Sequence, residues 1–377
     1  MWQSVGVGGV LQAPKWRQYF KRPSDALVIH RRRCKVAAGA ADKCETDGSS
    51  NARRMPSLPN TVRLKLAAYS AAQRPDGSFR YHLLSFGDLK AFASPWPDGM
   101  SVHSTDVTID ASRGLWARVF SPSVTRDTPL PVVVYFHGGG FMLFSAASHH
   151  YDTLCRRLCQ ELGAVVVSVN YRLAPQHRFP TAYNDGMAAL RYLDDNALHV
   201  PVDISSCFVA GDSSGGNIAH HVAQRWSSIS STSSPPVNLR LAGAILIQPL
   251  FGGVERTKAE LELHNLCPTL TLATADYFWR EFLPEDATRD HVASRVCGRD
   301  VESCFTPTMV VTGGFDLLRD RHAGYVEELR EEGKPVQLLD YPDAIHGFYL
   351  FPEIMDSGKI LTEMKLFVQE HKSKPVV

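Results

Sequence analysis

The chain has 377 residues, a formal net charge of +1, and eight cysteines without the spacing of metal ligands. This length suits one α/β domain of about 300 residues with an additional segment. The balanced charge gives no strong field for nucleic acid or an anionic membrane surface. No apolar run reaches the roughly 18 residues of a membrane span. We therefore expect no nucleic-acid partner, no membrane span, no metal and no cofactor, and protein partners stay open.

The first 54 residues differ in composition from the rest. Residues 1–40 contain eight basic side chains and one acidic side chain, Asp25. An Arg-rich, acid-poor start is typical of organellar transit peptides, although translation starting at Met55 also fits. We interpret residues 1–54 as a disordered or targeting extension and residues 55–377 as one domain. We expect a cytoplasmic protein, with a nuclear location and organellar targeting left open.

The pattern after residue 60 predicts a helix followed by two strands. Val62, Leu66 and Tyr69 recur at the i, i+4 and i+7 positions of an apolar stripe, and Pro75 and Gly77 end the pattern. Strands are then predicted over residues 105–109 and 115–120, joined by a turn at 110–114.

A glycine-rich loop follows the next predicted strand, residues 131–136. The strand leads into His137 and then Gly138, Gly139 and Gly140. Successive glycines leave backbone N–H groups accessible, as stabilisation of a tetrahedral oxyanion requires. The alternative is a flexible glycine loop without a chemical role. The sequence does not determine which of the three glycines would donate.

A second motif points to a nucleophile. Another apolar strand is predicted at 164–169, and the run 207–210 precedes the sequence GDSSGG at 211–216 and a helical pattern. Strand, Gly-x-Ser-x-Gly and helix in this order form the context of a nucleophile elbow. The alternative is an ordinary Gly/Ser turn. We predict that Ser213 is the nucleophile and that the N–H of Ser214 joins the glycines in an oxyanion hole.

Two further strands precede the acidic residue and the base that a serine nucleophile needs. Residues 308–312 predict a strand, after which Asp316 follows a glycine pair, whereas Asp320 falls one helical turn later. The strand at 336–341 leads to His346. Because α/β-hydrolase triads run in the order Ser, acid, His, we predict Asp316 and His346 as the partners of Ser213. Asp320 remains the rival, with capping or solvation of the next helix as its expected role.

Four motifs give the chain a family resemblance: HGGGF at 137–141, YRLAP at 171–175, GDSSGGN at 211–217 and DAIHGF at 343–348. The chain resembles plant carboxylesterases of the hormone-sensitive-lipase class of α/β-hydrolases, a family that also contains the gibberellin receptors. Alternating strands and helices, including a strand at 242–247, indicate a mostly parallel sheet with helices on both faces. The resemblance implies an α/β-hydrolase fold with helical cap segments near 56–104 and 252–295.

The resemblance also implies a choice between enzyme and receptor. In the receptors an aliphatic residue replaces the catalytic histidine, and serine usually stands where this chain has Gly140. The presence of His346 and Gly140 favours a serine carboxylesterase that hydrolyses small-molecule esters through an acyl-enzyme. A receptor with little or no hydrolysis is the alternative. Amide hydrolysis, lyase activity and lipid hydrolysis by the same triad form a third class.

Overall fold

The computed structural model describes residues 55–96, 99, 101–123, 128–196, 198–233, 237–264, 266–301 and 305–373. The extension expected at residues 1–54 lies outside this set. No helix among the residues it describes is both long enough and apolar enough to cross a membrane.

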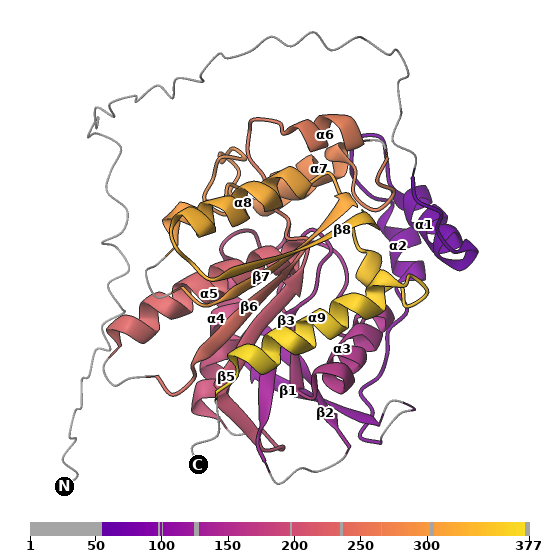
Figure 1. The fold of residues 1–377 in the computed structure, drawn as a ribbon. Coiled ribbons are helices and arrows are strands. Elements are labelled where there is room, and N and C mark those ends of the chain that lie inside the picture. Colours follow the sequence, from indigo (N-terminus) through magenta and orange to yellow (C-terminus); the bar gives the residue numbers. More distant parts are fainter. Residues whose placement is uncertain are drawn as a thin grey trace, which may run out of the picture. The chain divides into compact units, whose positions relative to one another are not determined.

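An eight-stranded sheet forms the centre of the domain (Figure 1). Its strand order is β1-β2-β4-β3-β5-β6-β7-β8. The β1–β2 and β2–β4 pairs are antiparallel, and the other neighbouring pairs are parallel. The strands are β1 Val102–Asp110, β2 Leu115–Pro122, β3 Leu130–Phe136, β4 Val165–Asn170, β5 Val202–Asp212, β6 Leu241–Ile247, β7 Thr308–Phe315 and β8 Val336–Ile345.

Helices connect and cover the strands. They are α1 Asn60–Ala72, α2 Tyr81–Gly87, α3 His149–Leu162, α4 Thr181–Asp195, α5 Ser214–Thr232, α6 Lys258–Leu263, α7 Leu272–Phe282, α8 Arg319–Glu331 and α9 Asp356–His371. Short 3₁₀ turns occupy Ala111–Arg113, Gly298–Asp300 and Phe348–Leu350.

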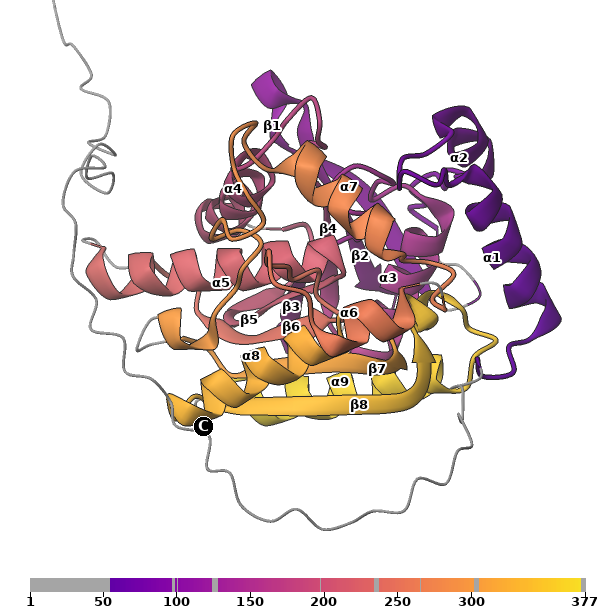
Figure 2. The ribbon, with the colours of Figure 1, turned by 90° about the horizontal axis from the view of Figure 1, so that it is seen from above.

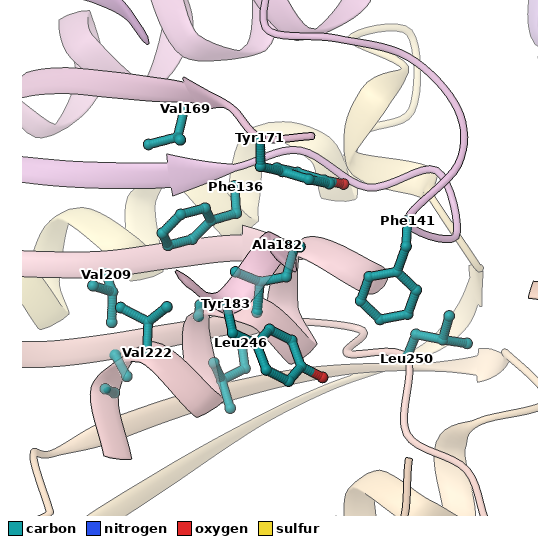
Figure 3. Close-up of a cluster of buried hydrophobic side chains, with 14 of the residues drawn as sticks. Phe136, Phe141, Val169, Tyr171, Ala182, Tyr183, Val209, Val222, Leu246 and Leu250 are labelled. Carbon is teal, nitrogen blue, oxygen red and sulfur yellow. The ribbon is translucent and has the colours of Figure 1, made fainter. Parts of the chain in front are cut away.

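Each face of the sheet has its own hydrophobic core. Side chains alternate between the two faces along a strand, so Val134 of β3 belongs to the core that includes residues of α4, α5 and α8, while Val133 belongs to the core that includes residues of α3 and α9. Figure 3 shows part of the first core, where Phe136, Val209 and Val222 pack together. Strands buried on both faces consist almost entirely of apolar residues, which is why their positions could be predicted.

The predicted fold class is confirmed: the chain has an α/β-hydrolase fold with a mostly parallel sheet covered on both faces. The strands predicted from apolar runs are all present, and several are longer than the runs themselves. Strand β5, for example, starts at Val202 rather than Cys207, because its first residues are only partly buried and include polar side chains. Strands β5, β7 and β8 lead directly to Ser213, Asp316 and His346.

The two segments expected to form a cap contact one another. In Figure 2, α7 crosses the view above the strands, and α1 and α2 lie to one side. Phe79, between α1 and α2, stacks on Phe278 of α7 with ring centroids 5.7 Å apart. The hydroxyl groups of Tyr81 and Tyr277 are hydrogen-bonded at 2.9 Å.

Candidate active site

Ser213 occupies a strained turn between β5 and α5. Its backbone angles are φ 51° and ψ −118°, a conformation that a residue with a side chain seldom adopts. The flanking glycines permit the turn. A Cβ atom at Gly211 would lie 2.3 Å from the carbonyl oxygen of Gly215, and one at Gly215 would lie 1.9 Å from that of Phe136. The sequence G-x-S-x-G is thus required by the close approach of three backbone segments.

The imidazole of His346 lies within hydrogen-bonding distance of both Ser213 and Asp316. The Nε2 atom of His346 is 3.0 Å from Ser213 Oγ, and its Nδ1 atom is 2.8 Å from Asp316 Oδ2. With the proton on Nδ1, the imidazole donates to Asp316, and Nε2 accepts from the serine hydroxyl. The three residues are separated by up to 133 positions in the sequence, and the carboxyl ends of parallel strands bring them together.

Asp316 is fully buried and has a second hydrogen bond. Its Oδ1 atom accepts from the backbone N–H of Leu318 at 3.0 Å. Burial raises the pKa of this carboxyl, but the charge and hydrogen bond of His346, together with the charge of His322 and the N–H of Leu318, outweigh burial, so the pKa lies below its ordinary value. The rival carboxylate, Asp320, has a different partner: its Oδ2 accepts from the N–H of Ala259 at the start of α6.

The candidate oxyanion donors differ in their hydrogen bonds. The N–H of Gly138 donates to the Tyr151 hydroxyl at 2.8 Å and to Asp212 Oδ1 at 3.0 Å. Within the described residues, the N–H groups of Gly139, Gly140 and Ser214 donate no hydrogen bond. The N–H groups of Gly139, Gly140 and Ser214 are therefore available to donate to an oxyanion. The N–H of Gly138 instead donates to protein groups, the Tyr151 hydroxyl and the Asp212 carboxylate.

An aromatic ring from α7 lies directly against the glycine loop. A Cβ atom at Gly140, whose φ is 62°, would lie 2.2 Å from the ring of Phe278. Phe278 is 3 % exposed and is held from its other side by Phe79. Any side chain at position 140, serine included, would require Phe278 to move. The packing of α7 on the loop therefore requires glycine at position 140.

Gln248 is a site residue that the sequence analysis missed. It is fully buried with φ 43°, and its side chain donates to the Ile345 carbonyl at 3.2 Å and accepts from the Gly347 N–H at 2.7 Å. It thus holds the peptide groups on both sides of His346. The hydroxyl of Thr269 also donates to the His346 carbonyl at 2.6 Å. A glutamine after a predicted strand carries no sequence signal for this role.

Buried histidines near the site make stability depend on pH. Burial lowers the pKa of His137, the residue before the glycine run, to about 4, and that of His220 on α5 to about 3. The unfolded chain therefore binds protons that the folded chain does not between about pH 4 and about pH 6.5, and stability rises with pH across this window.

We expect the free energy of unfolding to fall on acidification from about pH 7 to about pH 5, by up to about 1.4 kcal/mol per pH unit for each such histidine. Urea unfolding at both pH values measures this difference. His220→Gln should reduce the dependence, whereas His82→Gln, at an exposed position, should leave it unchanged. Equal stability at both pH values would contradict the prediction.

The fold and the Ser-His-Asp grouping at the carboxyl ends of its strands define an α/β-hydrolase. Residues 133–350 match the sequence profile of a family described as having the alpha/beta hydrolase fold. The chain belongs to this family, in the hormone-sensitive-lipase class that includes plant carboxylesterases and gibberellin receptors.

Relatives of both kinds are similar to this chain along most of its length. It is 40 % identical to the gibberellin receptor GID1C of Arabidopsis thaliana over 320 residues, 80 % of this chain and 90 % of the receptor. It is 36 % identical to carboxylesterase 20 of the same plant, over 80 % of this chain and 95 % of that protein. The structure of a hyperthermophilic esterase from Pyrobaculum calidifontis matches 84 % of this chain and 99 % of its own, with a TM-score of 0.66 and 26 % identity.

Proposed function

We propose that the protein is a carboxylesterase that hydrolyses small carboxylic esters through an acyl-enzyme on Ser213. One observation carries the proposal: the His346 imidazole lies 3.0 Å from Ser213 Oγ and 2.8 Å from Asp316 Oδ2. A base in contact with the nucleophile and an acid that orients the base are the requirements for activating a serine hydroxyl. The presence of carboxylesterases among the relatives supports the same reaction.

In the proposed reaction, Ser213 Oγ attacks the carbonyl carbon of the ester while His346 Nε2 accepts the serine proton. The tetrahedral intermediate collapses with cleavage of the ester C–O bond, and the imidazolium gives its proton to the departing alcohol. Water then attacks the acyl-enzyme in the same way and releases the carboxylic acid. Asp316 keeps the imidazole in the required tautomer and stabilises the imidazolium.

The developing oxyanion would be stabilised by the N–H groups of Gly139, Gly140 and Ser214. Loss of one such donor typically costs about 100- to 1,000-fold in rate.

We further propose that residues 56–104 and 252–295 act as the cap of a domain spanning 55–377, separate from the segment 1–54. The aromatic contacts among Phe79, Phe278 and Gly140 support apolar cover beside the oxyanion, and such cover strengthens electrostatic stabilisation there.

Turnover of p-nitrophenyl acetate, butyrate and octanoate by the purified chain tests the proposal. We expect saturable hydrolysis, with short acyl chains preferred because Ser213 is buried and the ring of Phe278 lies against the glycine loop beside it. The three esters share one leaving group, so differences among them report the acyl side alone. No turnover of any of them above the buffer rate would contradict the proposal.

Gibberellin binding is the second candidate function, favoured by the 40 % identity to a gibberellin receptor. Calorimetry with a bioactive gibberellin, carried out on the same preparation, separates the two. Turnover without binding supports the esterase. Binding without turnover would instead identify a receptor that retains the residues of a triad.

A further inference from the structure

Asp212, the residue before Ser213, is a buried carboxylate with an unusual number of hydrogen-bond donors. It is 1 % exposed. Its Oδ1 atom accepts from the Tyr135 hydroxyl at 2.7 Å and from the Gly138 N–H at 3.0 Å. Its Oδ2 atom accepts from the hydroxyls of Tyr151 at 2.8 Å and Tyr349 at 2.9 Å. All three tyrosines are themselves buried.

The donors come from separate parts of the chain that meet at the site. Tyr135 is on β3 and Tyr151 is on α3, while Gly138 begins the glycine run. Tyr349 follows His346 by three residues and lies in the 3₁₀ turn after it. One carboxylate therefore connects the turn of the nucleophile to the oxyanion loop and to the loop that carries the base.

The donor set matches an ionised carboxylate. Each oxygen receives two hydrogen bonds, and the Tyr151 hydroxyl, which already accepts from Gly138, has its proton left to donate. Burial holds the pKa of Asp212 above its ordinary value, and the three phenolic hydrogen bonds and the charge of His346 limit that rise. Charge-assisted hydrogen bonds are stronger and shorter than neutral ones, so the cluster is suited to fixing the position of its members.

We propose that Asp212 is a positioning residue for ester hydrolysis. It fixes the positions of the oxyanion loop and of the loop that carries His346 relative to Ser213. The inference rests on the proposed function. By binding the N–H of Gly138, the cluster fixes the orientation of the peptide groups that follow, those of Gly139 and Gly140. Misplacement of catalytic groups by about 1 Å costs about 100-fold in rate, so precise anchoring of this loop has a direct effect on turnover.

Three variants test the role, each compared with wild type on p-nitrophenyl butyrate. Asp212→Asn keeps the shape of the side chain but removes its charge and one acceptor. Tyr151→Phe and Tyr349→Phe each remove one donor. Tyr325→Phe is the matched control, because it removes a buried hydroxyl that is hydrogen-bonded to His220 at 2.9 Å and not to Asp212.

We expect Asp212→Asn to lower kcat by about 100-fold, the two tyrosine variants to lower it less, and KM to change little. Binding of a trifluoromethyl ketone, which forms an oxyanion-bearing adduct with the serine, should weaken in parallel with kcat/KM. Binding of the corresponding methyl ketone, which forms little adduct, should not. Tyr325→Phe should retain wild-type kinetics.

A purely structural role would give a different pattern. Wild-type kcat in Asp212→Asn would overturn the inference, as would wild-type kcat in both Tyr151→Phe and Tyr349→Phe. So would equal weakening of both ketones, because the loss would then concern general binding rather than the oxyanion. These outcomes require an active wild type, and an inactive wild type would instead contradict the proposed function and with it this role of Asp212.

Discussion

Ser213→Ala should reduce the turnover of p-nitrophenyl butyrate by about 10⁶-fold, the scale typical of removing a triad serine. The hydroxyl that forms the acyl-enzyme would be absent, while the turn itself would persist because Gly211 and Gly215 still permit the close backbone approach. Steady-state kinetics on folded protein measures the loss. A melting temperature near that of wild type would exclude unfolding as its cause.

Ser214→Ala is the matched control for this substitution. It removes a neighbouring hydroxyl but leaves the backbone N–H of residue 214 in place, so turnover should persist. A fluorophosphonate probe should label Ser213 in wild type and in Ser214→Ala. Labelling of Ser214 with Ser213 unmodified would show that the nucleophile has been misassigned.

His346→Val should also abolish most turnover, by several orders of magnitude, because Ser213 loses its proton acceptor. The glycine loop and the contact between Phe79 and Phe278 do not involve this imidazole, so affinity for a non-hydrolysable ester analogue should change little. Parallel measurement of kcat and of the analogue's dissociation constant separates catalysis from binding. The substitution places an aliphatic side chain at the position of the proposed base.

His346→Val leaves the Asp316 carboxylate buried without its partner, which is destabilising. His346→Gln is a useful second variant, because its amide can still donate to Asp316 but cannot accept a proton from Ser213. Both variants should be inactive. Hydrolysis by wild type and both variants at one slow rate would show that the triad does not act as a catalyst and would favour a binding protein.

The fold could be predicted because its signals are local. Strands such as β3 and β4 are apolar runs, since they are buried on both faces. The glycine motifs are likewise short patterns in the sequence, although part of their cause is long-range, since Gly215 is required by the close approach of Phe136. The chain order of Ser213, Asp316 and His346 was enough to propose the triad, although not to give its distances.

The surroundings of the site could not be predicted, because they depend on contacts between distant residues. Asp212 and Tyr349 are 137 positions apart, and Gln248 is 99 positions from Gly347. No pattern within a window of sequence specifies such hydrogen bonds. The difference among the three glycines also depends on tertiary contacts, since the N–H of Gly138 already donates to Tyr151 and Asp212.

Trapping of the acyl-enzyme tests the central claim most directly. Wild-type protein mixed with p-nitrophenyl butyrate is quenched in acid during turnover, digested and examined by mass spectrometry. We predict one butyryl group on the peptide that contains Ser213, its loss as the substrate is exhausted, and no such adduct in Ser213→Ala. Turnover with Ser213 unmodified at every quench time, or an adduct that never turns over, would contradict hydrolysis through this serine.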